Sequence, residues 1–303
     1  MNEAISVNNI SKWYGDFQAV KNLTFDVQRG EIFAVLGPNG AGKSTSIRMI
    51  LDIIKPDQGN ILVLGSKMND QLKNRIGYLP EERGLYKTVK VLDMMTYLGR
   101  LKGLSSADAK SRARDYLAKL ELSEHENSKV EALSKGMQQK VQFAVTVMHA
   151  PELIIIDEPF SGLDPVNRLI VKDLLQELRD NGTAIVMSTH QMNQVEEMAD
   201  RMLMISRGER KLYGKVDDIR KEYAQHAIIV EGQGDWGKLA GVAGIEQEAG
   251  RPTVLLHLQP DTTQDSVLEA IATDDSINIE RFERAIPSLD DIFIRVAGEK
   301  ANA

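Results

Sequence analysis

The apolar residues of this 303-residue chain fall into short, separate blocks whose spacing predicts strands or helices. Residues 5–33 alternate between apolar and polar side chains, with a turn at Gly15-Asp16, which predicts short antiparallel strands. Later blocks are continuously or almost continuously apolar, which is typical of parallel strands covered on both faces. The chain is therefore expected to belong to the α/β class. These continuous blocks are residues 32–36, 153–156 and 184–188.

Helical spacing dominates the middle of the chain. After residue 89, apolar residues recur at steps of three, beginning with Leu92 and Met95. Helices are expected to begin near Ser105 and near Ser134, because serine is a favoured N-cap residue. Residues 89–150 are thus expected to form a helical block inserted between strands of the sheet.

The composition changes after about residue 222. Residues 227–283, with a central turn at Gly250, have strand and helix spacing in the order β-α-β-β-α-β. This order is typical of a small ferredoxin-like α+β domain. We expect two domains, residues 1–222 and residues 223–303, and no catalytic constellation is recognisable in the second.

A glycine-rich segment, Gly-Pro-Asn-Gly-Ala-Gly-Lys-Ser-Thr, lies between the strand-like block 32–36 and a helical pattern that continues to Ile54. It fills G-x-x-x-x-G-K-[ST] at every specified position, in the strand–turn–helix context of a phosphate-binding loop. Its glycines let backbone N–H groups surround a phosphate, and the helix N-terminus adds a positive dipole. Lys43 is expected to contact the β- and γ-phosphates of a nucleoside triphosphate, and Ser44 to bind Mg²⁺. The residues of this expected site, called the phosphate loop below, are Gly37, Pro38, Asn39, Gly40, Ala41, Gly42, Lys43, Ser44 and Thr45.

Two carboxylates, Asp157 and Glu158, follow the apolar block 153–156. Because ligands lie beyond the carboxyl ends of strands in open α/β sheets, both side chains are expected beside the phosphate loop. Asp157 is placed to bind Mg²⁺, and Glu158 to orient or deprotonate the attacking water. His190 follows the block 184–188 of the same sheet, where a side chain could contact a γ-phosphate.

Composition narrows the function classes. The formal net charge of −7 and the sequence pI of about 5.4 argue against a broad nucleic-acid-binding face. The chain has no cysteine, which excludes disulfides, thiolate metal sites and cysteine nucleophiles. The N-terminus does not have the pattern of a secretory signal, and the apolar runs are too short to span a bilayer. If the protein works at a membrane, another chain is expected to supply the membrane part.

The order of the motifs resembles that of ATP-binding-cassette (ABC) ATPases over roughly residues 4–215. Residues 133–139, Leu-Ser-Lys-Gly-Met-Gln-Gln, resemble the family's signature motif, usually written L-S-G-G-Q. Residues Ser161–Asp164 resemble the family's D-loop, and His190 its switch histidine. The resemblance implies a P-loop NTPase with a RecA-like mixed sheet, an antiparallel β subdomain and an inserted helical subdomain, followed here by the ferredoxin-like domain. From the residues alone, Tyr14 is either a half-buried strand residue or a stacking platform, and the resemblance implies stacking on adenine.

In this family, two nucleotides are held between two copies, so the resemblance implies a homodimer or a pair with a paralogous ATPase. The residues then expected to contact the partner's ATP are Ser134, Lys135, Gly136 and Asp164. Glu81 stands where the family's coupling loop usually has glutamine, and it is expected to help Ser44 and Asp157 bind Mg²⁺ or water. Lys135 and Met137 also depart from the usual signature sequence.

These departures, residues 79–86 and the trailing domain look like the export-type subfamily that includes sodium-extrusion ATPases. The resemblance implies a peripheral ATPase on the cytoplasmic face of the cell membrane, driving efflux through separate permease subunits. Sodium or drug efflux is one option for the cargo, and a peptide or a lipid is equally open. The helical block and the 81–90 loop would dock on those subunits. One alternative is a soluble ABC ATPase acting on a non-membrane partner, and another is a GTPase-like switch, whose N-K-x-D segment we do not find.

Overall fold

The computed structural model describes residues 2–82, 84–224, 226–247, 252–274 and 276–298. The chain divides into two compact units, Met1–Val216 and Asp217–Ala303. This division falls shortly before the expected boundary at residue 222. Within the described ranges, no helix is long and apolar enough to cross a bilayer.

The first unit is built on a six-stranded sheet with the order β5-β6-β7-β3-β8-β9. Neighbouring strands are parallel except for β8 and β9, which are antiparallel. The strands β3, β6 and β7 are almost wholly buried, as their continuous apolar sequences predict. The strand bounds are β3 (Ile32–Leu36), β5 (Ile76–Leu79), β6 (Leu153–Asp157), β7 (Ala184–Thr189), β8 (Arg201–Ser206) and β9 (Glu209–Lys215).

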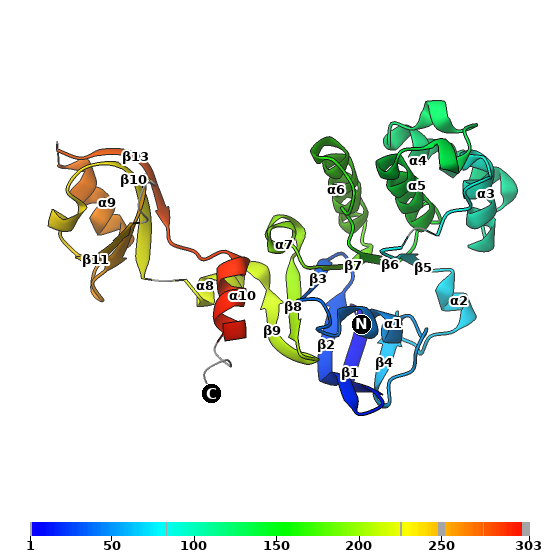
Figure 1. Ribbon diagram of the computed structural model, residues 1–303, viewed down its shortest axis with the longest axis horizontal. Helices are drawn as coiled ribbons and strands as arrows, with labels where there is room; N and C mark the ends of the chain where they lie inside the picture. Colours follow the sequence, from blue (N-terminus) through cyan, green and yellow to red (C-terminus); the bar gives the residue numbers. More distant parts are fainter. Residues whose placement is uncertain (1, 83, 225, 248–251, 275, 299–303) are drawn as a thin grey trace. The chain divides into compact units, whose positions relative to one another are not determined.

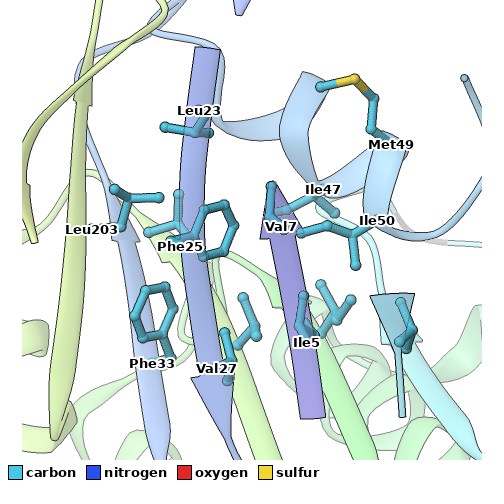
Figure 2. Packing of buried hydrophobic residues seen from close by; sticks show 14 of the residues in the cluster. Ile5, Val7, Leu23, Phe25, Val27, Phe33, Ile47, Met49, Ile50 and Leu203 are labelled. Atoms are coloured by element: carbon cyan, nitrogen blue, oxygen red, sulfur yellow. The ribbon is translucent and has the colours of Figure 1, made fainter. Parts of the chain in front are cut away.

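A three-stranded antiparallel sheet, β2-β1-β4, contributes the other half of the core. It consists of β1 (Glu3–Tyr14), β2 (Phe17–Gln28) and β4 (Gln58–Val63). The helix α1 (Lys43–Ile50) packs Ile47 and Ile50 beside this sheet (Figure 2). The rings of Phe25 and Phe33, one from each sheet, stack with their centroids 5.7 Å apart. Each such buried side chain contributes about 1.5–3 kcal/mol, so this core anchors α1 through its second turn.

Three helices form the expected helical block, α3 (Val91–Leu101), α4 (Ser106–Lys119) and α5 (Lys135–Val147). They gather at the β5–β6 end of the sheet (Figure 1). Ser105 and Ser134 are the N-caps of α4 and α5, each accepting a hydrogen bond from a backbone N–H. The block is not helical throughout, because two short 3₁₀ turns, Ser123–His125 and Val130–Ala132, separate α4 from α5.

Several short elements differ from the sequence prediction. The helical pattern expected to continue to Ile54 ends with α1 at Ile50, because Asp52 has a φ of 60°, which no α-helix accommodates. The spacing did not predict β9 or the helices α2 (Asp70–Lys73), α7 (Met192–Met198) and α8 (Val216–Glu222). The remaining helix of the first unit, α6, spans Pro165–Asp180.

The second unit has an antiparallel sheet with the order β11-β12-β10-β13, the order of a ferredoxin-like fold. The first helix of the expected β-α-β-β-α-β order is only a 3₁₀ turn, Trp236–Lys238, since glycines at 234, 237 and 241 disfavour a helix there. The turn expected at Gly250 lies outside the described residues. The elements are β10 (Ala227–Gln233), β11 (Val242–Gln247), β12 (Thr253–Leu258), α9 (Gln264–Ala272), β13 (Asn278–Arg284) and α10 (Leu289–Gly298).

Candidate nucleotide site

The register of the parallel sheet brings three strand ends to one edge. Leu36, the last residue of β3, pairs with Thr189 of β7, and Asp157 of β6 pairs with Ser188. The phosphate loop begins directly after Leu36. It therefore starts at the same edge at which β6 reaches Glu158 and β7 reaches His190.

Close backbone packing requires glycine at two positions of the phosphate loop. A Cβ atom at Gly37 would lie 2.1 Å from the carbonyl oxygen of Ile205. Gly42 has a φ of 110°, and a Cβ atom there would lie 2.7 Å from the carbonyl oxygen of Ala19. Gly37 also has a positive φ, of 149°, so at both positions only glycine fits the space and the backbone conformation. The start of β2 and the end of β8 thus fix the shape of the loop.

Lys43 lies under the loop and is only 9% exposed. Its Nζ donates hydrogen bonds to the carbonyl oxygens of Gly37, at 2.6 Å, and Pro38, at 3.1 Å. The ammonium group is thus held at the concave side of the loop, where a phosphate-binding loop holds anionic oxygens.

Three predicted carboxylates act on the same lysine. Burial lowers the pKa of Lys43, while the negative charges of Glu158, Asp157 and Glu81, in that order, raise it. The side chain of Glu81 is exposed, and that of Glu158 is only 12% exposed. The fold therefore gathers acidic residues from two separate segments, the end of β6 and the residues after β5, around the phosphate-loop ammonium group.

The carboxylate of Glu158 is held by the end of β7. Its Oε1 lies 2.6 Å from Nδ1 of His190 and accepts a hydrogen bond from the His190 backbone N–H at 3.2 Å. Its Oε2 lies 3.3 Å from Oγ1 of Thr189. The histidine expected to face a γ-phosphate contacts the neighbouring glutamate here. Sequence spacing did not identify Thr189 as a member of this cluster.

The residues predicted to bind Mg²⁺ supply the right type of donor. Ser44 is exposed at the start of α1, and the Ser188 hydroxyl donates to Oδ1 of Asp157. Hydroxyl and carboxylate oxygens suit Mg²⁺, which usually takes one or two carboxylates together with substrate phosphates and water. Among the described residues, no group of three His, Cys, Asp or Glu side chains could hold a metal ion. A magnesium ion at this edge would depend on phosphate oxygens for its remaining ligands.

A pocket of about 240 Å³ opens in front of the phosphate loop. Tyr14, at the end of β1, lines it and is 50% exposed. Phe17, at the start of β2, also lines it and was not predicted as a site residue. The register of the β1–β2 hairpin pairs Phe17 with Tyr14, so this register would have indicated that Phe17 lies beside the predicted site residue. The complete lining is Tyr14, Phe17, Ala19, Asn39, Gly40, Ala41, Gly42, Lys43, Ser44 and Thr45.

The residues predicted to contact a partner's ATP form a second cluster that does not line this pocket. Ser134 accepts a hydrogen bond from the Met137 backbone N–H at 3.2 Å, which caps α5. A Cβ atom at Gly136 would lie 3.6 Å from the carbonyl oxygen of Gly162, so the start of α5 lies against the D-loop. Lys135 is exposed beside them.

A buried lysine joins α5 to α6 next to this cluster. Lys140 is 4% exposed, and its Nζ donates a hydrogen bond to Oδ1 of Asn167 at 2.7 Å. The Asn167 backbone N–H donates to Oδ1 of Asp164, which caps α6, and this bond lowers the pKa of Asp164. The signature segment and the D-loop are therefore tied together within one chain.

The mixed sheet, the phosphate loop and the acidic strand ends define a P-loop nucleoside triphosphatase. Two family models match the chain: "ABC transporter" over residues 20–161 and "ATP-binding protein DrrA1-3-like, C-terminal domain" over residues 214–297. The chain belongs to the family of ABC transporter ATP-binding proteins, and it is an ATPase subunit of that class.

Individual relatives support the same assignment. The uncharacterized ABC transporter ATP-binding protein YhaQ of Bacillus subtilis (strain 168) is 38% identical, over 97% of this chain and 98% of its own. Nod factor export ATP-binding protein I of Cupriavidus metallidurans is 33% identical, over 72% of this chain and 73% of its own. A solved ATP-binding subunit of an ABC transporter is 32% identical with a TM-score of 0.68, covering 73% of this chain and 93% of its own. The expected fold class and ABC resemblance are confirmed.

Proposed function

We propose that this chain hydrolyses ATP for an ABC exporter and works as an ATP-dependent dimer on the cytoplasmic face of a membrane. The observation that carries the proposal is the separation of the predicted residues into two clusters. One surrounds the phosphate loop, and the other joins the signature segment to the D-loop. Because each chain has one loop and one signature segment, two chains related by two-fold symmetry would complete two equivalent sites.

Within one site, the geometry supports distinct roles for the side chains. Lys43 and the loop N–H groups would hold the phosphates of ATP, and Ser44, Asp157 and Glu81 would hold Mg²⁺. When bound, Mg²⁺ neutralises charge on the phosphates. Glu158 would orient or deprotonate the attacking water, since its carboxylate is held in place by His190 and the end of β7.

Ser134, Lys135 and Gly136 would contact the ATP bound by the partner, because a capped helix N-terminus presents N–H groups and a positive dipole to an anion. Asp164 would contribute from the adjacent D-loop. A homodimer is the simplest arrangement, and a paralogous ATPase with the same motifs would complete the sites in the same way.

Export is supported by the printed function of one relative, a Nod factor export ATP-binding protein. We assign no cargo, neither sodium nor a drug, because the cargo path would lie in the permease subunits. Exposed side chains of the helical block and of the 81–90 loop offer a surface for those subunits. Tyr86 and Tyr97 are 53% and 50% exposed and lie edge to face, with centroids 6.3 Å apart, and Leu101 is 59% exposed.

The test of hydrolysis is the Glu158→Gln variant. Removing a positioned general base typically costs 10²–10⁴-fold in rate, so steady-state ATP hydrolysis should fall at least about 100-fold while ATP binding is retained. A variant that still turns over ATP at the wild-type rate would contradict the role of Glu158. Recovery of tagged protein with RNA or a soluble complex, without a permease, would favour the non-membrane alternative.

A further inference from the structure

Phe17 is unusual among the phenylalanines of this chain. Its side chain is 64% exposed, whereas the other six phenylalanines are buried or half-buried. A single exposed apolar side chain needs no explanation. Phe17, however, lies in the wall of the pocket in front of the phosphate loop, beside a second exposed aromatic ring.

The hairpin β1–β2 places the two rings on the same side. Tyr14 and Phe17 are paired across the Gly15–Asp16 turn, and directly opposed residues of an antiparallel pair project from the same face of the sheet. Ala19 lies two residues further along β2 and also lines the pocket, as expected for alternate residues of one strand. The carbonyl oxygen of Ala19 approaches Gly42 of the phosphate loop. The face carrying both rings is thus continuous with the wall of the phosphate site.

We propose that Phe17 is a second nucleoside-contacting residue, which packs against the base and ribose of the bound purine nucleotide while Tyr14 stacks on the base. The proposal rests on the proposed use of this pocket for the nucleotide. Aromatic contacts of this kind tolerate any base, because every base has a π-face. The two rings would therefore hold adenine and guanine nucleotides alike, while the phosphate loop holds the phosphates.

The contact can be separated from phosphate binding by comparing ligands with and without a nucleoside. Calorimetric titration would measure the Kd values of MgADP, MgGDP and magnesium pyrophosphate for the full-length chain. Diphosphates are used in place of triphosphates so that no hydrolysis occurs during the measurement. Phe17→Ala should weaken ADP and GDP about fivefold to tenfold and leave pyrophosphate unchanged, because only the nucleoside loses a stacking partner. Phe17→Tyr, which keeps the ring, should bind ADP as the wild type does.

Two further variants complete the experiment. Leu169→Ala, which removes an exposed apolar side chain of α6 outside the pocket, should leave all three Kd values unchanged. If Tyr14→Ala weakens ADP and Phe17→Ala does not, the nucleotide site stands and the role of Phe17 is wrong. Equal weakening of ADP and pyrophosphate by Phe17→Ala would mean a disturbed phosphate loop, which also overturns the proposal. A wild-type chain that binds neither ligand would overturn the proposed function together with this inference.

Discussion

At the scale of single residues, the backbone of Glu158 is under strain at the position where chemistry is expected. Its φ is 55°, in the left-handed region that residues other than glycine seldom adopt. Such conformations cost of order 1–3 kcal/mol and persist only where surrounding contacts fix them. The hydrogen bonds from the end of β7 to the Glu158 carboxylate are contacts of that kind. The free energy of folding therefore includes an unfavourable contribution from this backbone conformation, which fixes the position of the Glu158 carboxylate.

A second residue, His149, is buried and makes the stability of the first unit depend on pH. It is 8% exposed, and its Nε2 lies 3.3 Å from the carbonyl oxygen of Ile76. Burial, with a smaller contribution from the charge of Lys102, lowers the pKa of His149 from 6.5 to about 4. Between these two values, the unfolded chain binds a proton that the folded chain does not, so stability falls as the pH falls.

We therefore predict that His149→Leu weakens the pH dependence of unfolding. A shift from 6.5 to about 4 corresponds to a loss of about 2 kcal/mol between pH 7.5 and pH 5. Denaturant unfolding at these two values should give a drop smaller by about that amount in the variant, whatever the variant's absolute stability. The same drop in both proteins would show that His149 is not responsible.

At the scale of secondary-structure elements, the sequence predicted those strands and helices that a pattern within one segment specifies. The buried strands β3, β6 and β7 and the capped helices α4 and α5 follow from apolar spacing and cap residues. The strand β9 was missed, because its sequence Glu-Arg-Lys-Leu-Tyr-Gly-Lys has neither clear alternation nor a continuous apolar run. It is held by antiparallel pairing with β8, which only the folded chain reveals.

The difference between local patterns and contacts formed only on folding also applies to the residues of the candidate nucleotide site. Motif spacing predicted the phosphate loop and the acidic strand end, since their residues are consecutive in the chain. Ser188 and Phe17 join the site through strand register, and the contact between Lys140 and Asn167 joins two helices. No spacing within one segment indicates such contacts. They depend on the arrangement of elements that are distant in the sequence.

The link between α5 and α6 leads to a second prediction. Lys140→Met removes the hydrogen bond to Asn167 and leaves a side chain of similar length in a buried position. Because Asn167 is only half-buried, a water molecule can replace the lost donor, so we expect little loss of stability. We expect kcat for ATP hydrolysis to fall about tenfold, as for a catalytic group displaced by a fraction of an ångström, because the signature segment would no longer be fixed to the D-loop.

The matched control is Lys172→Met on α6, whose lysine pairs with Glu197 instead. It should hydrolyse ATP at the wild-type rate. Both variants should bind ADP as the wild type does, since neither lysine lines the pocket. If Lys140→Met retains full activity, or if its ADP affinity falls together with kcat, the link does not position the signature segment.

At the scale of the whole molecule, we propose that one chain carries two half-sites. The phosphate loop with its carboxylates forms one half, and the signature segment with the D-loop forms the other. Closure of two chains around ATP would join each half to its complement, and hydrolysis would release them. Such a dimer would be a two-state switch whose equilibrium is set by contacts to the γ-phosphate.

Cysteine crosslinking tests this proposal most directly, because the chain has no native cysteine that could react. Asn39→Cys and Ser134→Cys would be introduced separately into the Glu158→Gln protein, and the two variants mixed and treated with a short bis-maleimide. We predict a crosslinked dimer of the two variants, at twice the 33.7 kDa mass of one chain, with MgATP but not with MgADP. If no such dimer forms with MgATP, or if it forms equally well without nucleotide, the phosphate loop and the signature segment do not share a nucleotide, and the proposed dimer is wrong.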